Sequence, residues 1–230
     1  MTGAVGPARV DAAAHAFVSA LDKPVLAPED RHHLERVLRL RRGDLVTVSD
    51  GAGGWRSCTF GPALSPSGPI EQEPSPTPPI TVAFGVLKGD RPELVVQKLT
   101  ELGVDRVVPM TAARCVVQWD GERARRHTDR LRRVSREAAM QARRAWLPEV
   151  DDVRPFADVA SWPGAALADA SGDPVSLDRP VVLVGPEGGW APEEAASGLP
   201  TVALGPHVLR AETAAIVAGA LLAARRAGCV

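Results

Sequence analysis

The chain has 230 residues, of which 45% are hydrophobic and 24% charged, and its formal net charge is −1. That length suits one large domain or two smaller ones, and the composition is that of an ordinary globular protein. A net charge near zero excludes binding of nucleic acid by overall positive charge. A nucleic-acid surface would therefore have to come from locally clustered arginines.

Sorting signals and metal ligands are not apparent. The three cysteines form no CxxC pair and no zinc-type spacing with histidine, which predicts no metal site and a reducing compartment. Residues 1–10, MTGAVGPARV, lack the charged and apolar regions of a signal peptide. The longest apolar run, residues 213–224, is too short to span a bilayer. We therefore expect a soluble cytoplasmic protein.

The first part of the chain predicts a small β-rich domain. Residues 28–44 have the pattern of a helix that begins near Asp30 and ends at Gly43. Residues 45–48 and 55–60 are β-like runs on either side of a glycine-rich turn, as in a hairpin.

A segment dense in Pro, Ser and Gly follows at residues 61–80. It has no hydrophobic periodicity and predicts a long loop or linker. We place the domain boundary there, which gives domains 1–74 and 75–230.

The second part alternates between strand-like and helix-like segments. Strands are predicted at residues 80–87, 105–111, 114–118, 165–169, 181–185 and 201–204, and helices at 90–103, 122–145 and 212–228. This alternation predicts an α/β domain whose parallel sheet is covered on both faces.

Two glycine-marked turns stand out near the C-terminus. VVLVGPEGGWAPEE (181–194) and TVALGPHVLRAETAAIVAGALLAA (201–224) each contain an apolar run that stops at Gly-Pro. Ligands of open α/β sheets bind outside the carboxyl ends of such strands, so the two loops predict one small-molecule pocket. The alternative is that GPEGG is a tight turn without a ligand.

The residues of the first turn narrow the kind of ligand. The turn lacks the Lys-Ser/Thr of a P-loop, the chain has no GxGxxG fingerprint, and Glu187 would repel a phosphate. A cationic or neutral ligand, held by backbone groups that glycine leaves accessible, fits better.

Arg210, Glu212 and Thr213 begin the last helix. An arginine and a carboxylate beside a glycine-rich turn can stabilise a developing anion and accept a proton. The alternative is that Glu212 and Thr213 only cap the helix and complement its dipole.

Arginines cluster in the long helix and near the N-terminus. Each cluster is either a solvated face or a phosphate-binding patch, and a GC-rich genome would give the same bias toward arginine. If both are patches, the two domains would hold one RNA. The candidate RNA-binding residues are Arg31, Arg39, Arg42, Lys88, Arg91, Arg125, Arg126, Arg132, Arg133 and Arg144.

Five motifs in order extend over nearly the whole chain. They are RHHLERVLRLRRGD (31–44), KGDRPELVVQKLTELGV (88–104), REAAMQARRAWLPEV (136–150), LVGPEGGW (183–190) and LGPHVLRAETA (204–214). In these motifs the chain resembles the bacterial 16S rRNA uracil-N3 methyltransferases of the SPOUT superfamily. The family typically has an acidic residue and a glycine where this chain has Met140 and Arg143.

The resemblance implies a fold and a function. The fold is an N-terminal PUA-like β-barrel followed by a SPOUT domain with a trefoil knot, in a homodimer. The implied reaction is methylation of N3 of a uridine in 16S rRNA, with S-adenosylmethionine as cofactor. That cofactor is a sulfonium cation, which agrees with the argument against phosphate.

The family pattern also assigns site residues. We expect catalytic roles for Arg210, Glu212 and Arg114, with Arg210 stabilising the uridine anion and Glu212 accepting the proton. The expected cofactor-binding residues are Gly185, Pro186, Glu187, Gly188, Gly189, Leu204, Gly205, Val208, Leu209, Thr213 and Ala214. Three other functions stay open: a SPOUT methyltransferase for another rRNA or tRNA base, a non-catalytic RNA-binding ribosome-assembly factor, and a nucleotide-dependent transferase.

Overall fold

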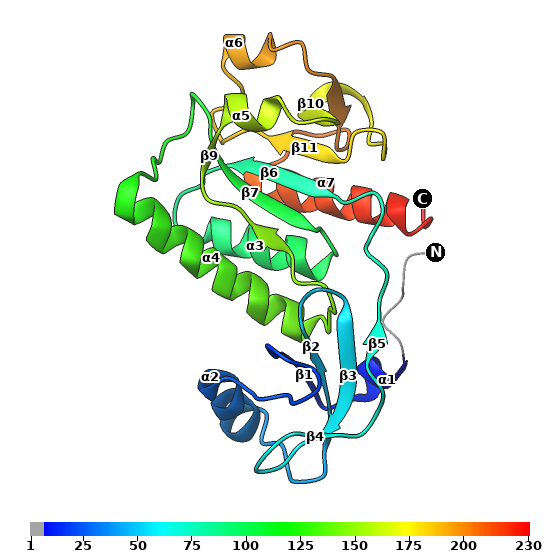
Figure 1. Cartoon of the computed structure of the whole chain (residues 1–230). Helices are drawn as coiled ribbons and strands as arrows, with labels where there is room; N and C mark the ends of the chain where they lie inside the picture. The colour runs from blue at the N-terminus through cyan, green and yellow to red at the C-terminus, as the bar shows by residue number, and fades with distance from the viewer. Residues whose placement is uncertain (1–6) are drawn as a thin grey trace. The chain divides into compact units, whose positions relative to one another are not determined.

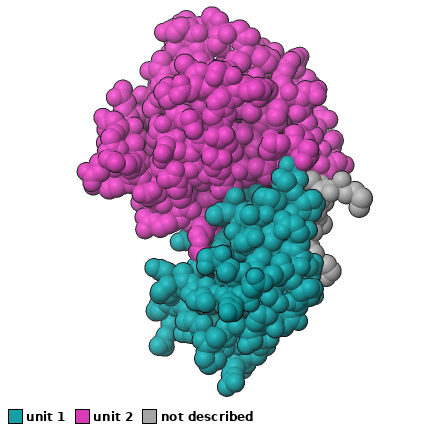
Figure 2. Space-filling view, viewed as in Figure 1, with its two compact units in different colours: residues 1–76, 137–147 teal, residues 77–136, 148–230 magenta. Residues whose placement is uncertain are grey.

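A computed structural model describes residues 7–230 of the chain. The prediction that the N-terminus is not a signal peptide rests partly on residues 1–6, which lie outside the described residues. Contacts within the chain divide it into two compact units (Figure 2). Unit 1 consists of residues 1–76 and 137–147, and unit 2 of residues 77–136 and 148–230. The domain boundary near residue 75 stays a prediction.

Unit 1 contains a small mixed sheet. Its strands are β1 (Ala14–Phe17), β2 (Leu45–Ser49), β3 (Gly54–Thr59), β4 (Ser65–Pro66) and β5 (Glu71–Gln72), and α1 (Pro7–Asp11) precedes them. The order is β1-β2-β3-β4, and β5 also pairs with β3. The antiparallel pairing of β2 with β3 confirms the predicted hairpin, whereas β1 runs parallel to β2.

Two predictions for unit 1 are wrong in detail. The helix predicted within residues 28–44 is shorter. It consists of α2 (Pro28–His32) and a π-helix, η1 (His33–Val37), and it ends there because Arg39 has a left-handed φ of 56°. The residue that precedes α2 is Ala27 rather than Asp30. The linker predicted over 61–80 contains β4 and β5, whose residues pair with β3 and so belong to the sheet.

Unit 2 is built on a seven-stranded sheet. The strands are β6 (Thr81–Gly85), β7 (Arg106–Thr111), β8 (Glu149–Val150), β9 (Arg154–Pro155), β10 (Ala165–Pro174), β11 (Val181–Val184) and β12 (Thr201–Ala203). Their order is β12-β10-β11-β6-β7-β8, with β9 also paired to β7. Every pairing is parallel, which confirms the predicted parallel sheet.

Helices cover both faces of this sheet (Figure 1). The helices of the second part are α3 (Arg91–Glu101), α4 (Gly121–Gln141), α5 (Phe156–Ala160), α6 (Pro192–Ala195) and α7 (Ala211–Arg226). Because side chains alternate along a strand, Phe84 packs with Leu99 and Leu222 of α3 and α7. The neighbouring Ala83 belongs to a second cluster with Val159 of α5.

Two further predictions for the second part of the chain need correction. Residues 114–118 form a loop rather than a strand. The helix predicted to reach residue 145 ends at Gln141, since Arg143 adopts a φ of 56° and the Arg144 N–H donates to the Ala139 carbonyl oxygen at 2.9 Å. This turn is a left-handed helix end, for which glycine is the usual residue, and it explains why the family pattern has glycine at position 143.

No helix among residues 7–230 is long and apolar enough to cross a membrane. Closure of the first sheet into a barrel and the trefoil knot stay predictions.

Candidate functional site

The loops after β6, β7, β11 and β12 leave the same edge of the parallel sheet. Two of them are in direct contact, because a Cβ added to Gly85 would lie 2.9 Å from the Pro186 nitrogen. Gly85 therefore permits the turn after β11 to approach β6 closely.

The GPEGGW turn is held in place by its tryptophan. The Trp190 indole N–H donates to the Ala168 carbonyl oxygen of β10 at 3.1 Å. Its ring lies against Gly185, where an added Cβ would come within 3.2 Å of it. Gly189 has a φ of 69°, and its N–H donates to the Pro186 carbonyl oxygen at 2.9 Å. The glycines are thus required by a closed turn that packs under Trp190.

Glu194 is a structural residue that the sequence motifs did not single out. Its carboxylate accepts the N–H of Ala113 at 2.8 Å and that of Ala191 at 3.0 Å, and the residue is 6% exposed. It therefore ties the loop after β7 to the loop after β11. The sequence signal was the Pro192-Glu193-Glu194 start of α6, since an acid at the third helical position often bonds back to the cap.

Arg114 lies beside the glycine turn. Its guanidinium donates to the Gly188 carbonyl oxygen at 3.2 Å, and a Cβ added to Gly188 would lie 3.1 Å from the Arg114 Cβ. The next residue, Cys115, is half-buried, and burial raises the pKa of its thiol. The thiol is protonated at neutral pH, which argues against a thiolate nucleophile at this edge.

A second arginine, Arg91 at the start of α3, contacts two carboxylates. Its Nη1 lies 2.6 Å from Glu187 Oε1, and its Nε lies 3.9 Å from Glu212 Oε1. The charge of Glu187, which was expected to repel a phosphate, is therefore partly neutralised. The other oxygen of Glu212, Oε2, is buried without a hydrogen-bond partner. An ionised oxygen in this position calls for a donor from a ligand.

The loop between β12 and α7 is open. Gly205 has a φ of 150°, and Val208 is 97% exposed. Arg210 precedes α7 and is exposed. Its guanidinium makes no hydrogen bond or ion pair with the residues that the structure describes. A Cβ added to Gly189 or Gly205 would meet nothing within 4 Å, so both turns leave backbone accessible to a ligand.

The structure thus brings together part of the predicted site. Glu187, Gly188, Glu212 and Arg114 lie within one network of contacts. Arg91, predicted from the sequence to bind RNA, also belongs to this network. The described residues contain no group of three or more potential metal ligands.

The candidate RNA-binding residues fall in both units. Arg31 donates to Glu35 and to the Gly61 carbonyl oxygen, while Arg39 and Arg42 are exposed. Arg144 of unit 1 is half-buried. In unit 2, Lys88, Arg125, Arg126 and Arg133 are exposed. Arg132 bonds to the Val150 carbonyl oxygen and to Asp129 and Asp152, at 3.0 to 3.2 Å.

Comparison with known proteins identifies the family. An RNA methyltransferase domain matches residues 73–223 and an RNA methyltransferase PUA domain matches residues 26–61. Ribosomal RNA small subunit methyltransferase E of Mycobacterium bovis is 36% identical over 222 residues, with 84% of this chain and 83% of that protein covered. The protein of the same name from Bacillus subtilis is 29% identical over 220 residues, with 83% and 85% covered. The chain belongs to the ribosomal RNA small subunit methyltransferase E family.

Solved structures agree with this family assignment. A ribosomal RNA small subunit methyltransferase E from Neisseria gonorrhoeae, bound to S-adenosyl methionine, has a TM-score of 0.72 at 26% identity and covers 92% of this chain and 97% of its own. A putative methyltransferase from Legionella pneumophila, in complex with S-adenosylmethionine, has a TM-score of 0.78 at 26% identity with the same coverage. The predicted family and its enzyme class, an RNA methyltransferase with a PUA domain, are confirmed.

Proposed function

We propose that this protein transfers a methyl group from S-adenosylmethionine to N3 of a specific uridine in the 16S rRNA of the small ribosomal subunit. Two related proteins were solved with that cofactor, and the relatives act on small-subunit ribosomal RNA by name. The observation that carries the proposal is the buried, unpartnered Glu212 oxygen at the carboxyl edge of the sheet.

The residues at this edge fit the cofactor. Open backbone at Gly189 and Gly205 would admit its amino-acid or nucleoside part. We assign the cofactor contacts to Gly185, Pro186, Glu187, Gly188, Gly189, Leu204, Gly205, Val208, Leu209, Thr213 and Ala214. When bound, the cofactor supplies an electrophilic methyl group on a sulfonium sulfur.

The remaining chemistry belongs to the protein. Uridine N3–H is a weak acid, so its proton must leave and the resulting charge spreads onto O2 and O4. Arg210, which is exposed and unpaired among residues 7–230, supplies a guanidinium for that charge. Glu212 accepts the proton.

Arg114 has a supporting role in this proposal. Its bond to the Gly188 carbonyl oxygen holds the cofactor turn, so we expect it to act on cofactor binding first.

We also propose a cytoplasmic homodimer, as the family resemblance implies. The apolar side chain of Val208 is 97% exposed beside the site, and a second copy of the chain would cover it.

The test measures methyl incorporation into 16S rRNA by the purified protein, followed by nucleoside mass spectrometry and primer extension. The expected product is 3-methyluridine, which stops reverse transcriptase because N3 lies on the Watson–Crick edge. A different methylated nucleoside would move the proposal to another base. Absence of any methylated product would favour the non-catalytic assembly factor.

The role of Glu212 has its own variant. Glu212→Gln keeps the shape of the side chain and removes the base, so the rate of methylation is expected to fall about 100-fold or more. Calorimetric binding of S-adenosylmethionine checks that the site is still formed. A variant that binds the cofactor and methylates at the wild-type rate would remove Glu212 from the mechanism.

A further inference from the structure

The N-terminal half of α4 presents a basic hollow within unit 2. Arg123, Arg126, His127 and Arg130 line it, at helical spacings of three, four and seven residues that place all four on one face. From Arg123 to Arg130 the helix rises about 10 Å, more than one phosphate group needs. We call this surface the α4 hollow.

His127 is fixed in the α4 hollow by a stacked tryptophan. The rings of Trp119 and His127 are parallel within 5°, with centroids 4.3 Å apart, and Trp119 is buried. Burial and the charge of Arg123 lower the pKa of His127. The ring is therefore neutral at pH 7 and keeps an N–H to donate.

The hollow keeps an excess of positive charge. Arg130 pairs with Glu93 of α3 at 2.8 Å. Arg126 lies 3.7 Å from Glu122, but both side chains are more than 70% exposed, so this pair is weak. Arg123 has no acidic partner among residues 7–230. Two guanidinium groups are thus available to an anion.

The α4 hollow and the proposed active site both contact the start of α3. Glu93, the partner of Arg130, belongs to the first turn of α3, two residues after Arg91. Arg91 in turn contacts Glu187 and Glu212. The first turn of α3 therefore contacts both the hollow, through Glu93, and the edge of the sheet, through Arg91.

We infer that the α4 hollow binds backbone phosphates of the RNA whose base is methylated. Guanidinium groups match phosphate geometry with paired N–H donors, and the fixed imidazole adds a directional donor. The inference rests on the proposed function, because it takes RNA as the partner. It also separates the arginines of α4: Arg123 and Arg126 bind phosphate, whereas Arg132 is already occupied by Val150, Asp129 and Asp152.

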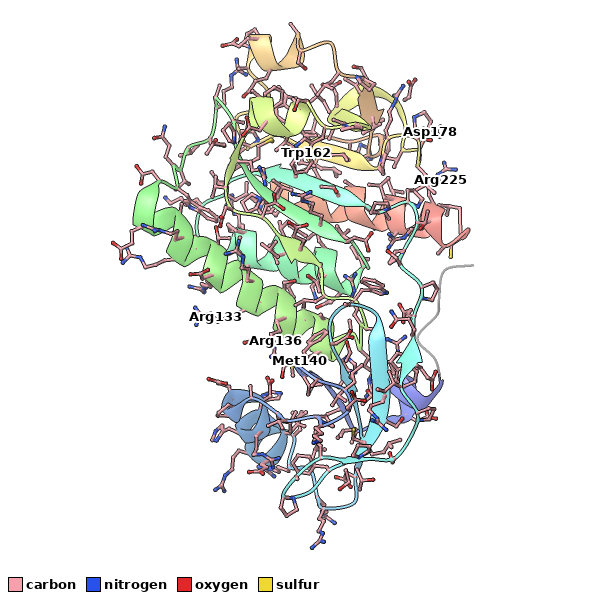
Figure 3. The ribbon with its side chains drawn as sticks, viewed as in Figure 1. Arg133, Arg136, Met140, Trp162, Asp178 and Arg225 are labelled. Atoms are coloured by element: carbon pink, nitrogen blue, oxygen red, sulfur yellow. The ribbon has the colours of Figure 1, made fainter. Side chains whose placement is uncertain are left out.

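The test compares two double variants of the full-length protein in binding to a 16S rRNA transcript at increasing KCl. Arg123→Gln/Arg126→Gln removes two charges from the hollow. Arg179→Gln/Arg225→Gln removes two charges elsewhere in unit 2, where Arg225 stands at the end of α7 (Figure 3). The hollow variant is expected to bind about tenfold more weakly, and its salt slope is expected to fall by about 1.4, or about 0.7 per lost phosphate contact.

Two further readouts separate the inference from the proposed function. S-adenosylmethionine binding by the hollow variant is expected to equal wild type, which shows that the unit is folded. Equal RNA affinity and salt slope in the hollow and control variants would overturn the inference, as would a wild-type protein that does not bind RNA. If the hollow variant loses RNA affinity but the wild type transfers no methyl group, the proposed function fails and the RNA surface stands.

Discussion

Arg91 contacts carboxylates from two different elements, Glu187 in the loop after β11 and Glu212 in the first turn of α7. The Arg91 and Glu187 side chains are 41% and 32% exposed. Such a pair adds at most about 1 kcal/mol to stability. The pair therefore acts by positioning: it fixes the glycine turn relative to Glu212, whose Oε2 is buried and has no hydrogen-bond donor.

Arg91→Gln is expected to weaken S-adenosylmethionine binding several-fold and to leave the midpoint of thermal unfolding nearly unchanged. The reason is that the GPEGGW turn loses the ion pair between Arg91 and Glu187 that positions it, whereas the hydrophobic core is unchanged. Calorimetry measures the affinity. Lys98→Gln is the matched control, since it breaks a Lys98–Glu101 pair on the same helix, away from the turn. Equal affinities in the two variants would show that Arg91 does not position the turn.

His15 is a buried histidine held in one tautomer. Its Nε2 lies 3.0 Å from the Arg144 carbonyl oxygen, which can only accept, so Nε2 carries the proton. Nδ1 then accepts from the Thr47 hydroxyl at 2.9 Å. Burial, together with the charge of Arg9, lowers the pKa of His15 to about 4.

Stability is therefore expected to fall as the solution is acidified. In the unfolded chain, His15 has a pKa near 6.5 and is protonated below that pH. In the folded protein, His15 is protonated only below about pH 4. Between these values the folded state loses up to about 3 kcal/mol, at about 1.4 kcal/mol per pKa unit. Urea unfolding from pH 7 to pH 4 measures this loss. His15→Gln should flatten the dependence and exposed His32→Gln should not; identical slopes in both variants would contradict the assignment.

At the scale of elements, the strands of unit 2 were predictable and several ends were not. Apolar β-branched runs marked β6, β7 and β11, because strands buried on both faces must be apolar throughout. The ends of η1 and α4 were not predicted. Arg39 and Arg143 adopt a left-handed backbone conformation there, which in a sequence is normally recognised by a glycine.

The same limit applied to the site. Its glycine turns were visible as local patterns, whereas the Arg91–Glu187 pair joins residues 96 apart in the chain. Only the fold brings such residues together. The Glu194 bond to Ala113, over 81 residues, was hidden for the same reason.

Helix α7 packs closely on α3 through a glycine. A Cβ added to Gly219 would lie 2.5 Å from Leu99 Cδ2 and 3.0 Å from Val104 Cγ2, both in fully buried side chains. Alanine at this position gains about 1 kcal/mol in helix propensity. Overpacking of a filled core costs about 1–3 kcal/mol.

Gly219→Ala is therefore expected to destabilise the protein by up to about 2 kcal/mol despite the better helix former. Urea unfolding of the single variants and of Gly219→Ala/Leu99→Ala measures the coupling. Because Leu99→Ala opens space beside the added methyl group, the double variant should be more stable than the sum of the single losses. Strict additivity would show that the two sites do not meet.

At the scale of the whole molecule, the chain leaves unit 1 after residue 76 and returns to it at residues 137–147. The returning segment fills positions that the first 76 residues leave open. The Ser49 hydroxyl donates to the Ala145 carbonyl oxygen at 2.8 Å, and the Leu147 N–H donates to the Gly51 carbonyl oxygen at 3.0 Å. Met140 packs against the core of the small sheet.

A fragment of residues 1–76 is consequently expected not to fold by itself. It would leave the buried His15 Nε2–H and the Ser49 hydroxyl proton without their acceptors, the carbonyl oxygens of Arg144 and Ala145, and unsatisfied buried polar groups cost about 1–3 kcal/mol each. Urea unfolding followed by circular dichroism should show no cooperative transition.

The matched control is a single chain that joins residues 1–76 to residues 137–147 through a flexible Gly-Ser linker. It restores the partners of His15 and Ser49 and should unfold cooperatively. An equally cooperative transition in the shorter fragment would show that the returning segment is dispensable, and that the first 76 residues hold a sufficient core. A domain of this size has a small free energy of unfolding. The loss of two buried hydrogen bonds and of the packing of Met140 should therefore be enough to unfold the fragment.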